Sequence, residues 1–381
     1  MGFSGIILAF HLVTVGFNAG SIGACISLGL LGCALATTAA TFTADRVGRR
    51  ATLILLALLM ALGGLGLMIA TQPSVLMAGV LLGMVNGMGR DRGAGVTVEQ
   101  VMLPQTTDES RRTAVFAWYN LVVDAGHAAG SLLGGLPGWL RHAAHVPALA
   151  SYQWSWALYS LLCLAAGGLV LGLSPSVELQ GRAPIARLSP RSRPFVVKFA
   201  ALSGLDSFAG GFLTTALMSY WFFRRFGVDE SLLGPLFFIV RIANGLSHLG
   251  AAWLAQRIGL VNTMVFTHVP SSLLLMTVPF APNLPVAITL FLIRESLVEM
   301  DVPTRQSYVV AVVRAEERTR ASGLTNLTRS LGWAAAPVMA GALMRALSLS
   351  APLFIGPGLK IVYDALLYRE FRHLAPPEER E

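Results

Sequence analysis

Long apolar runs, separated by short polar or basic segments, repeat along the whole chain. Since about 20 apolar residues cross the hydrocarbon core of a bilayer as a helix, each run is long enough to be a membrane span. The alternating ten-residue strands of a membrane β-barrel are not present. The pattern therefore predicts an all-α polytopic membrane protein. The predicted spans cover residues 21–43, 52–70, 74–104, 113–140, 154–174, 196–223, 231–256, 260–281, 285–313, 320–346 and 350–369.

The long polar connection at residues 175–195 divides the predicted spans into two groups. It contains four prolines and four arginines, which is typical of a linker. We predict an N-terminal helix bundle at 1–174, a cytoplasmic linker at 175–195, a C-terminal bundle at 196–369 and a cytoplasmic tail at 370–381. When the loops are assigned to alternate membrane faces, 17 basic residues fall on the linker's face. The opposite face receives four, so the positive-inside rule makes the linker's face cytoplasmic. Those four are Arg141, Arg224, Arg225 and Arg345.

The composition supports a membrane protein and gives no sign of a bound cofactor. Hydrophobic residues make up 54% of the chain and charged residues 13%, about half of what a soluble domain carries. The net charge of +8 is explained by arginines at cytoplasmic helix ends, near anionic lipids of the bilayer, so no nucleic acid partner is needed. Cys25, Cys33 and Cys163 all lie in apolar runs and suggest neither disulfides nor a metal site.

The loop at residues 41–52, TFTADRVGRRAT, carries the most specific motif. Its spacing resembles motif A of the major facilitator superfamily, Gly-x-x-x-Asp-Arg-x-Gly-Arg-Arg, with Thr41 in place of the leading glycine. The resemblance implies a gate in the loop between the second and third helices. The matching residues are Asp45, Arg46, Gly48, Arg49 and Arg50.

The same resemblance implies two six-helix bundles related by a pseudo-two-fold axis normal to the membrane. Residues 1–17 are apolar, but they are too short for a span and lack the basic leader and cleavage site of a signal peptide. Against the family pattern they correspond to the second half of an incomplete first helix, in an amino-terminally truncated chain. The resemblance also implies that the Asp45 carboxylate accepts hydrogen bonds from the amino end of the eleventh helix, near Arg320.

An internal repeat supports the two bundles. A shift of 206 residues superposes Gln100 on Gln306 and Asn120 on Asn326, and it also superposes Gly126 on Gly332. One offset that serves two adjacent spans indicates parallel repeats. The counterpart of motif A in the second half, residues 255–259, has no acid.

Ionisable residues within spans cost several kcal/mol unless they are paired or hydrated, so they mark candidate cavity groups. Asp301 and Arg305 are spaced for an i,i+4 pair. The family's fold brings the fourth and tenth helices together, so Glu99 and Arg305 are candidates for an ion-paired gate. Packing of all these charges within the bundles is the alternative. The candidates for binding substrate or protons are Arg92, Glu99, Asp124, Asp206, Arg294, Glu299, Asp301, Arg305 and Arg329.

Two of these positions and one further pair of residues have specific interpretations. Asp206 stands alone in an apolar stretch and is a proton-binding candidate; hydrogen bonding to Ser203 or Ser207 is its alternative. Asp124 can titrate when desolvated. Lys360 and Asp364 have the spacing of a structural i,i+4 pair.

The predicted function is secondary transport of a small molecule by alternating access, with proton-coupled efflux as the first choice. Gly126–Gly135 resembles the family's antiporter motif C, with Ser131 in place of its proline. Uptake of a polar or anionic metabolite and a non-transporting receptor or scaffold are the alternatives. An enzyme is not expected, because no metal motif or nucleophile constellation is present, and no phosphate-binding loop suggests ATP. The predicted location is a bacterial inner membrane.

Overall fold

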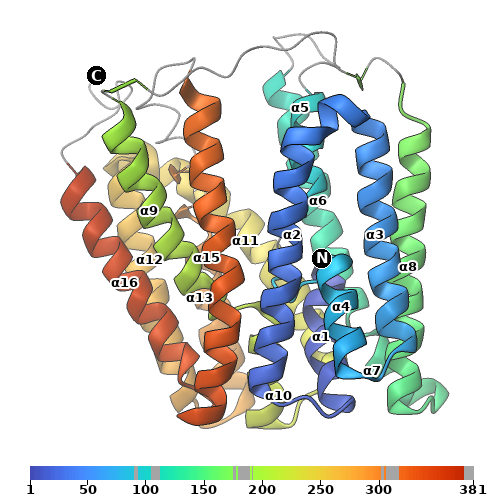
Figure 1. Ribbon diagram of the computed structural model, residues 1–381. Helices are drawn as coiled ribbons and strands as arrows, with labels where there is room; N and C mark the ends of the chain where they lie inside the picture. Colours follow the sequence, from blue (N-terminus) through green and yellow to red (C-terminus); the bar gives the residue numbers. More distant parts are fainter. Residues whose placement is uncertain are drawn as a thin grey trace. The chain divides into compact units, whose positions relative to one another are not determined.

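The computed structural model describes residues 1–89, 93–103, 112–174, 177–178, 189–190, 192–301, 304–305 and 317–372. Within these ranges the regular structure is helical, which confirms the predicted all-α membrane fold (Figure 1). Six of the described helices are long and apolar enough to cross a membrane. The helices are α1 (Gly2–Thr14), α2 (Ala19–Val47), α3 (Arg49–Ile69), α4 (Pro73–Leu82), α5 (Gly95–Met102), α6 (Arg112–Leu133), α7 (Leu136–Ala144), α8 (Ala148–Leu171), α9 (Ser192–Gly211), α10 (Thr215–Phe226), α11 (Glu230–Ile258), α12 (Leu260–Thr277), η4 (Val278–Phe280), α13 (Leu284–Val298), α15 (Arg318–Ala346) and α16 (Pro352–Phe371).

The chain forms two compact units. Unit 1 contains residues 1–182 and 214–238, and unit 2 contains residues 183–213 and 239–381. Unit 1 therefore holds α1 to α8 together with α10, while unit 2 holds α9, α12, α13, α15 and α16. The helix α11 begins in unit 1 and continues in unit 2.

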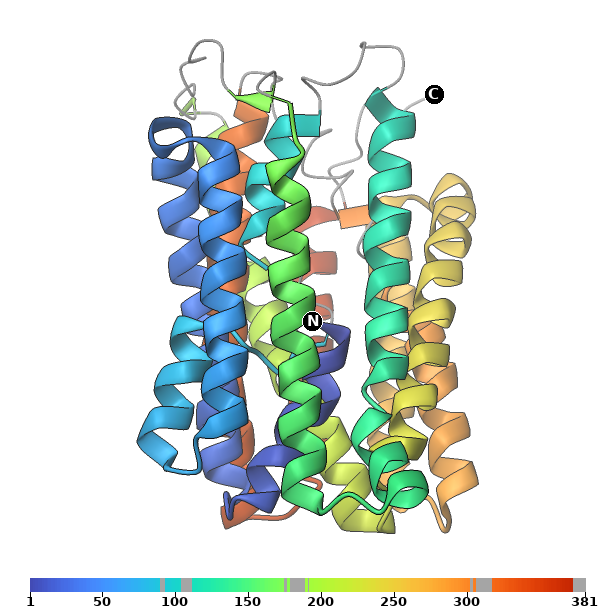
Figure 2. The same cartoon turned by 90° about the vertical axis from the view of Figure 1, so that its right-hand side faces the viewer.

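Unit 1 is built around the short first helix. Ile6, Ile7, Leu8 and Leu12 of α1 are completely buried, and α1 packs against α6, α8 and α10. At one side of the unit, α3 and α8 run side by side (Figure 2). Small residues allow close approach here, since a Cβ at Gly64 would lie 2.4 Å from the Ser160 hydroxyl. Residues 1–17 thus contribute a core helix rather than a surface one.

In unit 2, α9 packs along α15, and α16 packs against both α9 and α12. An aromatic cluster fills the space between these helices. Phe199 of α9 contacts Phe371 of α16 with ring centroids 5.7 Å apart, and Tyr363 is 1% exposed. This packing fixes the faces of α9, α12 and α16 that carry ionisable side chains.

Several predicted spans are broken rather than continuous. The span predicted at 74–104 is two helices, because α4 ends at Leu82 and α5 begins at Gly95. Met84 in the break adopts a left-handed φ of 53°, and Gly89 follows with a φ of 75°. Gly89 also has no room for a side chain, since a Cβ would lie 2.3 Å from the Thr215 hydroxyl. Periodicity alone does not reveal where α4 ends, because mostly apolar residues continue past Leu82 as far as Met88.

The broken segment of the fourth span is held by other parts of unit 1. The amide of Ala216, in the first turn of α10, donates to the carbonyl of Gly87 at 2.9 Å. The Thr215 hydroxyl donates to the carbonyl of Met88 at 3.0 Å, and Ser4 Oγ donates to that of Asn86 at 3.3 Å. These bonds satisfy carbonyls that a continuous helix would have bonded internally, so the break is stable in an apolar setting.

Candidate functional site

The motif A loop lies between α2 and α3, where the sequence predicts it. Gly48 ends α2 and caps α3 with a φ of 106°, a conformation that favours glycine. Asp45 Oδ1 accepts a hydrogen bond from Arg49 Nε at 3.1 Å, and the Arg49 side chain is 1% exposed. Arg46 is exposed to the surroundings. Within unit 1, Asp45 is thus bound to its own loop, and its predicted bond to the eleventh helix stays a prediction.

A second carboxylate, which the sequence analysis missed, caps α3. Glu178 accepts hydrogen bonds from the backbone amides of Arg49 at 2.8 Å and Arg50 at 3.1 Å. The guanidinium of Arg50 donates to the carbonyl of Leu171 at 2.8 Å, at the end of α8. A carboxylate at a helix amino terminus is favourable, because the unpaired amides and the helix dipole both attract negative charge. Arg49 and Arg50 of motif A therefore bind the end of α8 and the segment that follows it.

The densest group of buried charges lies in unit 2, and we call it the unit 2 ionic cluster. It joins side chains from α9, α12, α15 and α16 and from the segment after α13. Three acids and three bases balance one another, so the cluster is neutral when its histidine is neutral. Its members are Asp206, His268, Asp301, Arg305, Arg329, Lys360 and Asp364.

Asp206 lies at the centre of the unit 2 ionic cluster. Its Oδ1 accepts from Lys360 Nζ at 2.7 Å, and its Oδ2 accepts from Arg305 Nη1 at 2.9 Å. Arg329 Nη1 lies 3.7 Å from the same Oδ2. The pair that was predicted at Asp301 and Arg305 is present, with Arg305 Nη1 donating to Asp301 Oδ2 at 2.7 Å. All these side chains are at most 14% exposed, so the pairing compensates for their desolvation.

Two expectations about this region are wrong. Asp206 does not bond to its serine neighbours, because the Ser203 and Ser207 hydroxyls have no hydrogen-bond partner among the described residues. Lys360 and Asp364 do not pair directly either. Instead His268 lies between them, with Nε2 3.1 Å from Lys360 Nζ and Nδ1 3.1 Å from Asp364 Oδ1.

His268 was missed by the sequence analysis. It is 1% exposed and lies inside the apolar helix α12. The signal was available, because an ionisable residue within a predicted span is a candidate functional residue, and His268 lies in the span predicted at 260–281. Its partners could not be read from the sequence, since Asp364 is 96 residues away along the chain.

The other predicted positions lie outside the unit 2 ionic cluster. Arg294 pairs with its neighbour Glu295, and Asn244 of α11 donates to the carbonyl of Glu295 at 2.8 Å. Glu99 on α5 accepts a hydrogen bond from the Tyr119 hydroxyl of α6.

Asp124 on α6 and Glu299 after α13 are half-buried. Arg92 lies outside the described residues. The predicted gate between Glu99 and Arg305 would join the two units, and it stays a prediction.

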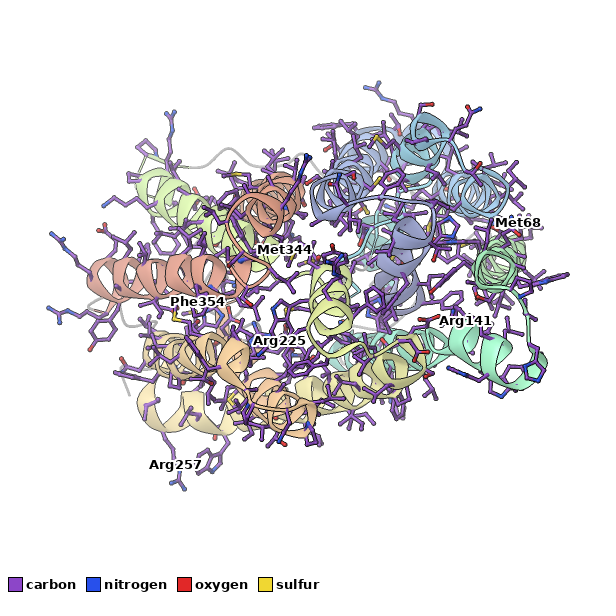
Figure 3. The ribbon with its side chains drawn as sticks, turned by 90° about the horizontal axis from the view of Figure 1, so that it is seen from below. Met68, Arg141, Arg225, Arg257, Met344 and Phe354 are labelled. Atoms are coloured by element: carbon purple, nitrogen blue, oxygen red, sulfur yellow. The ribbon has the colours of Figure 1, made fainter. Side chains whose placement is uncertain are left out.

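A smaller ionic group occurs in unit 1, where α7 meets the start of α11. Arg141, labelled in Figure 3, donates to Glu230 Oε1 at 2.6 Å, and its other terminal nitrogen lies 3.4 Å from Asp229 Oδ2. Glu230 is completely buried. His142 Nε2 lies 3.1 Å from Asp229 Oδ2. These bonds tie the end of α7 to the first turn of α11.

Burial would raise the pKa of Asp229, but its hydrogen bonds outweigh this effect. Ser231 and His142 bond to the carboxylate, and the charge of Arg141 acts in the same direction. The pKa of Asp229 therefore lies below its ordinary value.

At the other end of α11, Arg257 projects away from the helices (Figure 3). Its guanidinium lies over the ring of Trp253, 4.2 Å from the centroid, and Trp253 is 55% exposed. An exposed arginine stacked on tryptophan is typical of the membrane interface, where both side chains meet lipid headgroups.

Apolar helices of span length and buried, compensated charges define a class, the polytopic helical membrane proteins. Comparison with known families gives the particular one. The profile of the Major Facilitator Superfamily matches residues 1–337 and, in a second match, residues 200–379, so the chain belongs to this family of transporters. Membership points to transport rather than to catalysis.

Individual relatives are distant in sequence. The uncharacterized membrane protein YJR124C of Saccharomyces cerevisiae is 24% identical over 400 residues, which cover 96% of this chain and 89% of the yeast protein. The crystal structure of the nucleoside transporter NupG superposes with a TM-score of 0.74 at 14% identity, over 97% of this chain and 95% of that one. A D-xylose-proton symporter gives 0.74 at 13% identity, over 100% and 95%. These structures show that the fold is shared.

Proposed function

We propose that this protein is a secondary transporter that moves a small organic molecule by alternating access and couples the movement to protons. The observation that carries the proposal is the unit 2 ionic cluster. Seven ionisable side chains within one helix bundle are expensive to bury, and hydrophobic replacements of similar volume are often as stable or more so. Charges that stability does not require are expected where a solute or a proton passes.

Export is the direction that the sequence favours, through the resemblance of Gly126–Gly135 to motif C. The same fold serves a D-xylose-proton symporter, so the fold is compatible with either direction. Asp45 and the other motif A residues act in this proposal as the gate between conformations. The proposed orientation has the linker and the carboxyl terminus in the cytoplasm. A bacterial inner membrane remains the proposed location, although one similar protein is from yeast.

The second candidate is uptake of an anionic metabolite, and Arg329 favours it. Its Nη1 atom is buried and makes no hydrogen bond within the described residues, and it lies 3.7 Å from Asp206. The guanidinium also lies over the Trp333 ring, 4.8 Å from the centroid. A guanidinium that is not fully hydrogen-bonded suits a carboxylate or phosphate of the substrate.

The test is transport in proteoliposomes that contain the purified full chain and a trapped pH indicator. Uridine, D-xylose, benzoate and tetraphenylphosphonium represent nucleosides, sugars, organic anions and organic cations. The proposal expects one class to change the internal pH when it is added, and an imposed pH gradient to drive accumulation or depletion of that labelled compound.

A matched pair of variants makes this test specific to the buried charges. Lys360→Met removes a cation of the unit 2 ionic cluster, and Lys198→Met removes a cation of the same unit whose pair with Glu370 is exposed. Coupled movement should be lost in the first variant and kept in the second. Transport of a class without any pH change would refute proton coupling. Absence of movement for every class, with the protein folded, would favour the receptor or scaffold.

A further inference from the structure

Three cations surround Asp206 within 4 Å, which makes it a poor place for a proton. Opposite charges at such distances favour the ionised form of a carboxylate. Both oxygens already accept hydrogen bonds, Oδ1 from Lys360 and Oδ2 from Arg305. Protonation would remove an acceptor from one of these buried bases and leave its charge uncompensated. Asp206, which the sequence predicts as a proton-binding residue, therefore stays ionised and balances the positive charges of the cluster.

Asp364 is in a different situation. Its side chain is completely buried, and no lysine or arginine in the described residues bonds to it. Oδ1 bonds to His268, whereas Oδ2 has no hydrogen-bond partner in the described part of the chain. A buried, charged carboxylate oxygen without a donor is costly, and a proton reduces that cost by neutralising the group.

The geometry also fixes the state of His268 before a proton arrives. An ammonium group has only donors, so Lys360 Nζ donates to Nε2, and this nitrogen must carry the lone pair. The hydrogen of the neutral ring is then on Nδ1, which donates to Asp364 Oδ1. The hydrogen bonds run without interruption from Asp364 through His268 and Lys360 to Asp206.

The charged and titratable groups around this pair come from every neighbouring helix. Its own helix α16 contributes Lys360 and Tyr363, whose ring meets that of His268 edge-on at 6.2 Å. The helix α12 contributes His268 itself. The remaining groups are Asp206 from α9, Arg294 and Glu295 from α13, Asp301 and Arg305 after α13, and Arg329 from α15.

We infer that the His268–Asp364 pair is the proton-binding site of this transporter, with the proton held on Asp364 Oδ2. This inference rests on the proposed function for its purpose, but the site can be tested without a substrate. Proton binding gives the neutral cluster one surplus positive charge, and the hydrogen bonds of His268 and Lys360 connect the protonated Asp364 to Asp206. The bonds of Asp206 to Arg305 and its contact with Arg329 would respond to that charge, and this links the proton to the rest of unit 2.

The experiment is infrared difference spectroscopy of the purified full chain in lipid nanodiscs, between neutral and mildly acidic pH. The carbonyl stretch of a protonated buried carboxyl group should appear on acidification and be lost in Asp364→Asn, whose amide can still accept from His268 Nδ1. It should persist in Asp229→Asn, which removes a carboxylate outside the helices. A band that persists in Asp364→Asn would overturn the inference.

A second measurement does not depend on the folding of the aspartate variant. Nitrogen NMR of the wild type labelled in histidine, with the His268 signal assigned by its loss in His268→Gln, should show hydrogen on Nδ1 at neutral pH. Hydrogen on Nε2 would contradict the assigned chain of bonds. An Asp364 band in a protein that moves no protons with any solute would refute only the proposed function. Proton-coupled movement that survives in Asp364→Asn would refute only the site.

Discussion

The pair between Lys360 and Asp206 gives a quantitative test of the unit 2 ionic cluster. Nζ and Oδ1 are 2.7 Å apart, and each side chain is 6% exposed. With an effective dielectric constant of about 20, the attraction is about 6 kcal/mol before desolvation is subtracted. Lys360→Met leaves the Asp206 carboxylate with one cation fewer, and Asp206→Asn leaves Lys360 without its acceptor charge. Since each single variant leaves the buried cluster with one uncompensated charge, each should lose about 3–5 kcal/mol of stability.

The double variant separates charge pairing from simple loss of packing. It removes one charge of each sign, so the cluster stays neutral, and its loss should be about 1–3 kcal/mol smaller than the sum of the two single losses. The assay is unfolding of the four proteins in detergent micelles, followed by tryptophan fluorescence. Lys198→Met is the matched control, because its pair with Glu370 is exposed and should contribute at most about 1 kcal/mol. Strictly additive losses, or a control as damaging as Lys360→Met, would refute the ion-pair reasoning.

Three further predictions concern unit 1. Because the pKa of Asp229 is lowered, its contribution to stability is present above its ordinary pKa of about 3.9 and is lost as the pH falls through the lower value in the folded protein. Unfolding temperatures measured against pH should show this acid loss in the wild type and less of it in Asp229→Asn. Gly32→Ala places a Cβ 2.0 Å from a backbone carbonyl of α4 and should lower stability by about 1–3 kcal/mol. Gly126→Ala is the control, since no atom lies within 4 Å of its Cβ, and it should change thermal stability little. Equal losses of stability in the two variants would contradict the close packing of α2 against α4 at Gly32. Glu178→Gln keeps a hydrogen-bond acceptor at the start of α3 but loses the charge, so the protein should lose about 0.3–1 kcal/mol of stability. Thermal unfolding should show this difference from the wild type, and added salt should reduce it.

The helical membrane fold was predictable, because apolar runs of span length leave few alternatives. The breaks within spans were not. Residues 83–94 are glycine-rich, and their charges, at Arg90, Asp91 and Arg92, come only after mostly apolar residues have continued past Leu82, so the pattern does not show where α4 ends. What stabilises the break is the amide of Ala216, more than a hundred residues away along the chain. Such long-range bonds decide where a helix stops, and no local pattern contains them.

The candidate site was predictable only in part, for the same reason. Asp301 and Arg305 are four residues apart, so helical geometry alone indicated their pair. Asp206 and Lys360 are 154 residues apart, and a bond at that separation needs the packing of α9 against α16. Spacing was also misleading for Lys360 and Asp364, because His268 from another helix lies between them. Charge type and the i,i+4 pair could be read from the sequence, but the partners on other helices could not.

The charge balance of the unit 2 ionic cluster links the two proposed directions of transport to the charge of the substrate. With His268 neutral, the three acids and three bases cancel. A bound proton leaves one positive charge in excess, which strengthens binding of an anion near Arg329 and weakens binding of a cation. Linkage is reciprocal, so an anion would in turn favour the proton and a cation would oppose it. If the proposed proton site is correct, an anionic substrate would move together with the proton and a cationic one against it. In this proposal, under an inward proton gradient, a charged substrate that is exported is a cation and one that is taken up is an anion, so the charge of the first charged compound found to be transported tests the direction.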